Sequence, residues 1–369
     1  MKILLIDDRE DKRKEVYDAI KHLDSNVTIE CIDKINIKDY LPENASSSKD
    51  TKAPEDLLAE KLAEQNIDLI VVDHDLTMLD SQLSEPVVSI ASHAASIPLC
   101  RYARVKRTSN MSKLSDAVEA GTTFSIKIDI ENLSNAAKEM IDIAYGFKYL
   151  KTQIHGLDNN KIDKGPAYIL SNILGDLSQE DYFLQYSISA NILGDILELY
   201  SVEQNEDFDK TKIETIKRDR LSYIIGYWFY NSILKFPGVI LNKKATCSYL
   251  NISENGFGEH NHYFKIAQYN GPFSKFQDYW WKNKLNFILD EADAWTGKSL
   301  VEKQIDKEID SCKCIYEPSL DAGYYCVIKK EPVSKEQSLG TVSWLPKGAS
   351  LCRVGKEPYE QLSPLLGLQ

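Results

Sequence analysis

Acidic residues stand directly after two short apolar runs near the start of the chain. One run ends in the pair Asp7 and Asp8; a second ends in Asp73, and Asp75 follows two residues later. Carboxylates held close together repel one another unless a cation lies among them, and Mg²⁺ binds carboxylates together with water and phosphate oxygens. These residues could therefore hold Mg²⁺ for chemistry on a phosphoryl group. Their spacing fits a second interpretation equally, in which each acid only stabilises the start of the next helix.

The surrounding sequence predicts a parallel sheet that would bring these acids together. Short apolar runs alternate with amphipathic segments over the first 130 residues, and strands that alternate with helices form parallel sheets through right-handed crossovers. The expected strands are 2–6, 27–32, 68–73, 97–102 and 123–128, and the expected helices are 9–23, 54–65 and 113–120. In such a sheet the chemistry gathers at the carboxyl ends of the strands, where Asp7, Asp8 and Asp73 fall.

The order of these landmarks resembles the response-regulator receiver domain, which is a flavodoxin-like fold with a doubly wound, five-stranded parallel sheet. KILLIDD (2–8) is similar to the first strand and acidic pair of that family, and IDLIVVDHDL (67–76) is similar to its third strand. EAGTTFSIKI (119–128) is similar to the approach to the fifth strand, which carries a lysine near its end. The resemblance covers residues 1 to about 150.

This resemblance implies a role for each residue of the site. Asp73 would be the phosphoacceptor, and Lys127 would contact the acyl phosphate. Mg²⁺ would be held by Asp7, Asp8, Asp73 and the backbone carbonyl of Asp75. A histidine kinase or another phosphodonor would supply the phosphoryl group. Asp73 would attack phosphorus as a carboxylate nucleophile, while the other groups position and stabilise the group in transfer.

Several positions depart from the pattern of that family. The fourth strand should end in Ser or Thr, but Ala103 stands near that point, and Thr108 and Ser109 come later. Ile128 replaces the proline that usually follows the lysine. Tyr102 is a candidate for the aromatic switch position. The domain is therefore expected either to bind metal and phosphorylate poorly, or to be switched by another event.

The sequence becomes mainly helical after the predicted sheet. A continuous apolar stripe predicts one connecting helix over 132–154, which ends the receiver-like domain at residue 131. Phe147 and Leu150 extend this stripe beyond what one domain face can cover, so the rest of the chain or a partner should bury them. Residues 155–369 are assigned to an output region of helices with some strands, expected at 323–330 and 340–345. The predicted fold class is thus an α/β domain followed by a mainly α-helical region with C-terminal strands.

Motifs that suggest chemistry after residue 150 are weak. The run 297–299 (GKS) lacks the earlier glycine of a phosphate-binding loop, which favours a helix-terminal turn. His260 and His262 have no further ligand at metal-site spacing, which favours surface histidines. The segment 245–253 is faintly similar to the first helix and turn of a helix-turn-helix, but no basic helix follows it.

Composition and charge exclude several classes of protein. The 369 residues are 43% apolar and 27% charged, which fits two packed domains rather than a disordered chain. A net charge of -12 disfavours binding to nucleic acid or to anionic lipid. The seven cysteines lack the regular spacing of a disulfide framework. We find neither a signal peptide nor the roughly 20 apolar residues that cross a bilayer, and we expect a cytoplasmic protein.

Together these features predict a bacterial two-component signalling protein. Its receiver state would control a C-terminal region that contacts a protein partner, and neither a membrane nor nucleic acid is an expected partner. Two alternatives stay open at this point: an effector enzyme with its catalytic site after residue 150, and a transcriptional regulator that reads DNA. No catalysis is assigned beyond the phosphorylation of the receiver itself.

Overall fold

The computed structural model describes residues 1–41, 52–76, 78–103, 113–114, 124–187, 210–340 and 342–366. Their contacts divide the chain into two compact units, each assembled from separate stretches of sequence. The first unit comprises the described residues within Met1–Lys106, Thr123–Leu157 and Leu199–Tyr227. The second comprises those within Arg107–Thr122, Asp158–Glu198 and Trp228–Gln369. The predicted helix at 113–120 falls almost entirely outside the described residues.

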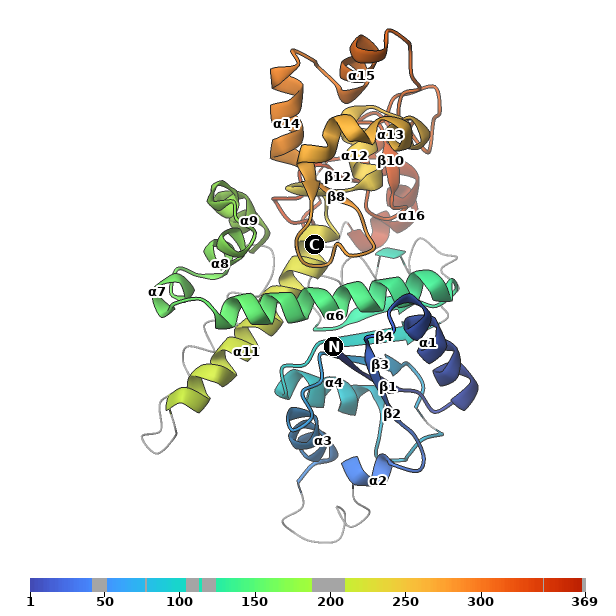
Figure 1. The fold of residues 1–369 in the computed structure, drawn as a ribbon. Coiled ribbons are helices and arrows are strands. Elements are labelled where there is room, and N and C mark those ends of the chain that lie inside the picture. Colours follow the sequence, from blue (N-terminus) through green and yellow to red (C-terminus); the bar gives the residue numbers. More distant parts are fainter. Residues whose placement is uncertain are drawn as a thin grey trace. The chain divides into compact units, whose positions relative to one another are not determined.

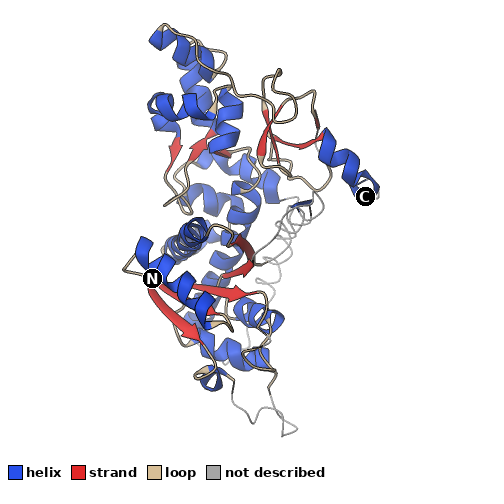
Figure 2. Ribbon diagram, turned by 90° about the vertical axis from the view of Figure 1, so that its right-hand side faces the viewer, coloured by secondary structure: helices blue, strands red, loops and turns tan. Residues whose placement is uncertain are grey.

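A five-stranded parallel sheet forms the centre of the first unit (Figures 1 and 2). Its strands are β1 (Lys2–Ile6), β2 (Thr28–Ile32), β3 (Leu69–Asp73), β4 (Leu99–Ala103) and β5 (Ile126–Asp129). They lie in the order β2-β1-β3-β4-β5, and all are parallel. This is the order of the flavodoxin-like fold. The structure therefore confirms the predicted α/β class and all five strands, and no strand end differs from its predicted position by more than three residues.

Helices cover both faces of this sheet. They are α1 (Glu10–Leu23), α2 (Ile37–Tyr40), α3 (Pro54–Ala63), α4 (Glu85–Ala94), α6 (Leu133–His155) and α11 (Lys210–Trp228). Figure 1 shows α1 beside α6 on one face and α3 beside α4 on the other. Ile3–Ile6 of β1 and Leu69–Val72 of β3 are apolar and buried because both faces of these strands are covered. Pro54 starts α3, and the side chains of Ser84 and Asn132 cap α4 and α6.

The predicted connecting helix is present as α6, and its distal half is buried as expected. Phe147 is 4% exposed and Leu150 is fully buried. The ring of Phe147 packs edge-on against Tyr227 of α11, with ring centroids 5.0 Å apart. Gly226 makes this contact possible, because a Cβ at that position would lie 2.3 Å from the Phe147 ring. α11, which begins at Lys210 and lies far from α6 in sequence, therefore covers the end of the stripe.

Polar contacts fix α11 to the amino end of the sheet. The Tyr227 hydroxyl accepts a hydrogen bond from the backbone N–H of Leu99, the first residue of β4, at 2.7 Å. Tyr223 contacts the His93 ring near the end of α4, and Arg220 donates to both the carbonyl and the ring nitrogen of His93. The first unit is therefore completed by a helix that lies far from the sheet in sequence.

The second unit contains short helices and two small sheets. Its helices are α7 (Asn159–Ile162), α8 (Pro166–Ile173), α9 (Glu180–Ser187), α12 (Lys243–Leu250), α13 (Glu254–His260), α14 (Lys282–Glu291), α15 (Gly297–Ile305) and α16 (Lys356–Leu366), with 3₁₀ or π segments η2 (Leu177–Gln179), η3 (Phe229–Leu234) and η4 (Asn261–Ala267). Its strands are β6 (Ile240–Asn242), β7 (Gln268–Tyr269), β8 (Tyr279–Trp281), β9 (Tyr324–Cys326), β10 (Glu331–Val333), β11 (Ser338–Leu339) and β12 (Cys352–Gly355). The sheets have the orders β6-β8-β7 and β10-β9-β12-β11.

Two local predictions for this unit meet different outcomes. The prediction of a strand at 340–345 is wrong. The N–H of Leu345 donates to the carbonyl of Val342 at 3.0 Å, so this segment forms a local turn and not the hydrogen bonds of a β-sheet. The predicted strand at 323–330 shrinks to the three residues of β9. The helix-terminal turn at 297–299 is confirmed, because Thr296 and Ser299 form a capping box at the start of α15. No helix in the described part of the chain is long and apolar enough to cross a bilayer.

Replacement of Phe147 by Ala should destabilise the first unit strongly. The ring is buried between α6 and α11, so its loss would leave a cavity in a core, at a cost of about 3–5 kcal/mol. Chemical denaturation of the full chain measures this cost. Tyr149→Ala is the matched control on the same helix, because Tyr149 is 42% exposed. Equal effects of the two changes would show that Phe147 is not a core residue.

His93 should make the stability of the first unit depend on pH. Burial, together with the charge of Arg220, lowers the pKa of His93 to about 4. The unfolded chain therefore takes up a proton near pH 6.5 before the folded chain does, and stability is lost as the pH falls from about 6.5 toward 4. Denaturation midpoints measured from pH 7.5 to 5 should fall less in His93→Gln than in the natural protein. Identical slopes would contradict this role.

Candidate functional site

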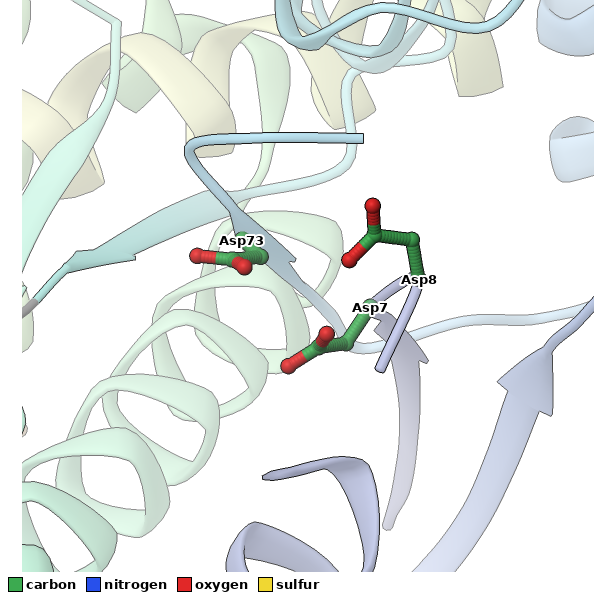
Figure 3. Close-up of side chains that lie close together, drawn as sticks. All are labelled: Asp7, Asp8 and Asp73. Carbon is green, nitrogen blue, oxygen red and sulfur yellow. The ribbon is translucent and has the colours of Figure 1, made fainter. Parts of the chain in front are cut away.

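Three carboxylates meet at the carboxyl edge of the parallel sheet (Figure 3). Asp7 and Asp8 directly follow β1, and Asp73 is the last residue of β3. One oxygen from each carboxylate lies within 4.8 Å of the other two. Asp7 is fully buried, and the side chains of Asp8 and Asp73 are 4% and 7% exposed. Among the described residues, this is the one group of three side chains placed to share a metal ion.

Backbone N–H groups orient all three carboxylates. Asp7 accepts from the N–H of Arg9 at 2.8 Å, and Asp73 accepts from the N–H of His74 at 2.8 Å. Asp8 accepts from the N–H of Met78 at 3.0 Å, which ties the loop after β1 to the loop after β3. These bonds hold the carboxylates in fixed directions, so the site is built before any ligand arrives.

Tyr102 of β4 is a further member of the site. It stands beside Asp73 in the register of β3 and β4, and its hydroxyl donates a hydrogen bond to the second oxygen of Asp7. Burial and this bond to Asp7 raise the pKa of Tyr102, so the phenol stays protonated and acts as a donor. β4 then ends at Ala103. The side chain that β4 directs to the acids is therefore the phenol of Tyr102, while Ala103 holds the strand end at which the resemblance implies Ser or Thr.

Arg9 supplies positive charge to all three acids. Its Nη2 lies 3.0 Å from Asp73 Oδ2, and its Nε lies 3.9 Å from Oδ1 of both Asp7 and Asp8. Its side chain is 52% exposed, so the guanidinium reaches the acids from the solvent side. The sequence analysis did not identify Arg9. The sequence does offer one signal: Arg9 directly follows Asp7 and Asp8. A cation next to the acidic pair in sequence can reach the carboxylates with its own side chain.

The net environment still opposes ionisation of Asp73. Burial is the largest cause, and the charge of Asp7 adds to it; together these outweigh Arg9 and the His74 N–H and raise the pKa of Asp73. The ionised carboxylate is therefore less stable in the folded chain than in water. A cation at this edge would relieve that cost.

Lys127 and Asp75 lie differently from the three acids. Lys127 of β5 is aligned with Arg101 of β4, and Arg101 is aligned with Val72 of β3. Lys127 is therefore level with Val72, one residue before the position of Asp73. Because side chains alternate along a strand, the side chain of Lys127 leaves the sheet on the face opposite to that of Asp73. Among the described residues, the cation in contact with Asp73 is Arg9. Asp75 is exposed two residues beyond Asp73.

The donors at this edge fit a hard divalent cation. They are oxygen atoms of three carboxylates, and Mg²⁺ prefers such ligands, with water completing its shell. No nitrogen or sulfur ligand of the kind favoured by zinc lies in the group. Asp7, Asp8 and Asp73 are therefore the residues that would hold Mg²⁺.

Comparison with protein-family models, with curated proteins and with solved structures gives no match to this chain. The site is interpreted from its own geometry.

Asp73→Asn should stabilise the protein when divalent cations are absent. Because the pKa of Asp73 is raised by folding, its negative charge reduces stability at all pH values above that pKa, and the neutral amide removes this cost. In EDTA at pH 7 we expect the melting temperature to rise by roughly 2–4 °C, equivalent to about 1 kcal/mol.

The same pair of proteins tests metal binding. A tenfold excess of Mg²⁺ over its dissociation constant would add about 1.4 kcal/mol to the natural protein and much less to Asp73→Asn. Equal Mg²⁺ effects in both proteins would show that the ion binds elsewhere. A lower melting temperature for Asp73→Asn in EDTA would show that the pair with Arg9 dominates.

Proposed function

We propose that the first unit is a receiver-type domain that accepts a phosphoryl group on Asp73 with Mg²⁺ held by Asp7, Asp8 and Asp73. The observation that carries this proposal is the convergence of three buried carboxylates at the carboxyl edge of a β2-β1-β3-β4-β5 sheet. The donor would be a histidine kinase or a small acyl phosphate. The second unit would be the output, and its contacts with a partner would change with the state of Asp73.

The chemistry asked of Asp73 is a simple group transfer. One carboxylate oxygen forms a bond to phosphorus while the bond between phosphorus and the donor atom breaks, and the leaving group departs with the bonding electrons. Bound Mg²⁺ would offset charge on the phosphoryl oxygens. The chain itself contributes orientation, because the His74 N–H holds one oxygen of Asp73, and the Tyr102 hydroxyl holds Asp7.

Arg9 favours a second candidate function for the same domain. Its guanidinium is bonded to the Asp73 oxygen at 3.0 Å and already offsets the charge of the cluster. Arg9 would then either move to the phosphoryl oxygens after transfer or hold the domain permanently in one state. In the second case the domain is a protein-interaction module that needs no phosphorylation.

β4 offers a physical route from the acidic site to α11. Tyr102, near its carboxyl end, contacts Asp7, and Leu99, at its amino end, contacts Tyr227 of α11. A change at Asp7 or Asp73 that releases the Tyr102 hydroxyl would alter the strand on which α11 rests. The helix then ends at Trp228, where the second unit resumes along the chain.

Incubation with acetyl phosphate and Mg²⁺ should add one phosphoryl group to the intact protein. The adduct should be absent from Asp73→Asn and from samples with EDTA. Glu10→Gln, a change at an exposed acid in the same segment, should label like the natural protein. We expect labelling over hours rather than minutes, because Lys127 leaves the sheet on the far face. Intact-mass spectrometry measures the adduct.

Arg9→Ala separates the two candidate functions. If Arg9 competes with Mg²⁺ for Asp73, its removal should strengthen the stabilisation by Mg²⁺ severalfold. If Arg9 holds a domain that is not phosphorylated, Arg9→Ala should weaken the fold, Mg²⁺ should have no effect, and no adduct should form in either protein. That second pattern would overturn the phosphorylation proposal.

A further inference from the structure

A segment of the second unit has the topology of a winged helix. After the π-helical η3, the chain forms β6, α12 and α13, continues through η4, and returns as the hairpin β7–β8. β8 pairs antiparallel with both β6 and β7, so the sheet order is β6-β8-β7. A strand, two helices joined by a tight turn, and an antiparallel hairpin in this order are the parts of a helix-turn-helix with a wing.

The turn between the two helices has the geometry that this motif needs. Asn251 ends α12 in the left-handed conformation (φ 54°, ψ 44°), which Asn tolerates better than most residues. Ser253 caps α13 by accepting from the N–H of Gly256. The apolar residues that face inward across this turn are fully or almost fully buried: Cys247, Leu250, Ile252 and Phe257. The turn is therefore fixed by packing as well as by its backbone.

The wing is anchored at its base and exposed at its tip. Phe273 adopts φ 67°, a conformation that is unfavourable for Phe, and its ring is buried against Phe229 and Tyr230 of η3 at 5.8 and 5.2 Å. The Tyr269 hydroxyl donates to the carbonyl of Pro272 at 3.0 Å. Strain of this kind persists only where the surrounding structure holds it, and it is frequent at functional sites. Lys275 stands exposed at the tip.

The exposed face of α13 and η4 carries groups that can read bases. Asn255, Asn261 and His262 are exposed, as are Glu259 and Lys265. Asn can bond adenine in two places, and Glu can accept from cytosine. The segment 229–291 holds seven lysines against five acids, a net charge of +2, in a chain whose net charge is -12. The net negative charge of the whole chain therefore does not describe this segment. Its own small positive charge does not repel the phosphates of DNA.

We propose that this segment binds double-stranded DNA, with α13 and η4 in the major groove and the wing at 270–278 along the adjacent backbone. This goes against the expectation from net charge that nucleic acid is not a partner. The folded segment has the shape and the local charge for duplex DNA. Lys243, Lys265 and Lys275 are three exposed cations of the segment that we assign to phosphate contacts. The exposed carboxylate of Glu259 weakens binding to DNA of arbitrary sequence.

Selection from a random duplex library by the full chain at low salt tests this proposal. Enrichment of a sequence is the expected result. Anisotropy with the enriched duplex should then give a log–log salt slope near -3, because about 0.9 counterions are released per phosphate contact. Lys275→Glu and Lys265→Glu should each weaken binding at least tenfold. Lys335→Glu, at an exposed lysine outside the segment, is the control and should change affinity less than twofold.

Three results would overturn the proposal: no enriched sequence, equal weakening by all three substitutions, or equal binding of single strands and duplexes. Weak capture of every duplex with no preference would show attraction by surface lysines only. A protein partner displaced by Lys275→Glu, without DNA binding, would assign the face to protein docking instead. Asp73→Asn should still bind the enriched duplex without a phosphodonor, so failure of the phosphorylation proposal would not be mistaken for failure of this one.

Discussion

The register of the parallel strands determines which side chains meet at the acidic edge. Ile6 pairs with Val72, so the residues that follow β1 emerge beside Asp73, and Asp73 in turn pairs with Tyr102. A slip of one residue would send each side chain to the opposite face and separate the phenol from the acids. The register is fixed because β1 and β3 are buried on both faces. The apolar residues of the sheet thus position the charged residues at its carboxyl edge.

Much of the first unit is predictable from periodicity, and the remainder depends on contacts distant in sequence. DLIVVD and KILLIDD mark buried strands whose ends carry the acids, because few other structures accept such runs. The place of Lys127 depends on the pairing of β4 with β5, and one residue of register separates it from the row of Asp73. Arg9 reaches the acids through a side-chain conformation that spacing does not reveal. The cover over Phe147 comes from α11, for which no local pattern provides a signal.

The second unit shows why composition is a poor guide to a local surface. From the sequence alone, the helix-turn-helix signal at 245–253 is outweighed because no basic helix follows it and because the chain is acidic. The fold adds what one-dimensional reading lacks: the short strands β6, β7 and β8 pair in the order that completes a wing. Strands of two or three residues are too short to show a periodicity in the sequence. Their pairing, and the packing of Phe273 on its aromatic neighbours at the base of the wing, are known only from the folded structure.

The interleaving of the two units along the chain has a consequence for biosynthesis. The sheet of the first unit leaves the ribosome early, yet α11 follows only after 158–198, which belong to the second unit. Until residue 227 emerges, Phe147 and the amino end of β4 lack their cover. The described residues 158–187 likewise lack their partners until the chain beyond 228 has emerged. At translation rates of about 5–20 residues per second, this interval lasts seconds. The nascent protein therefore passes through a stage in which both units are incomplete, a natural substrate for chaperones.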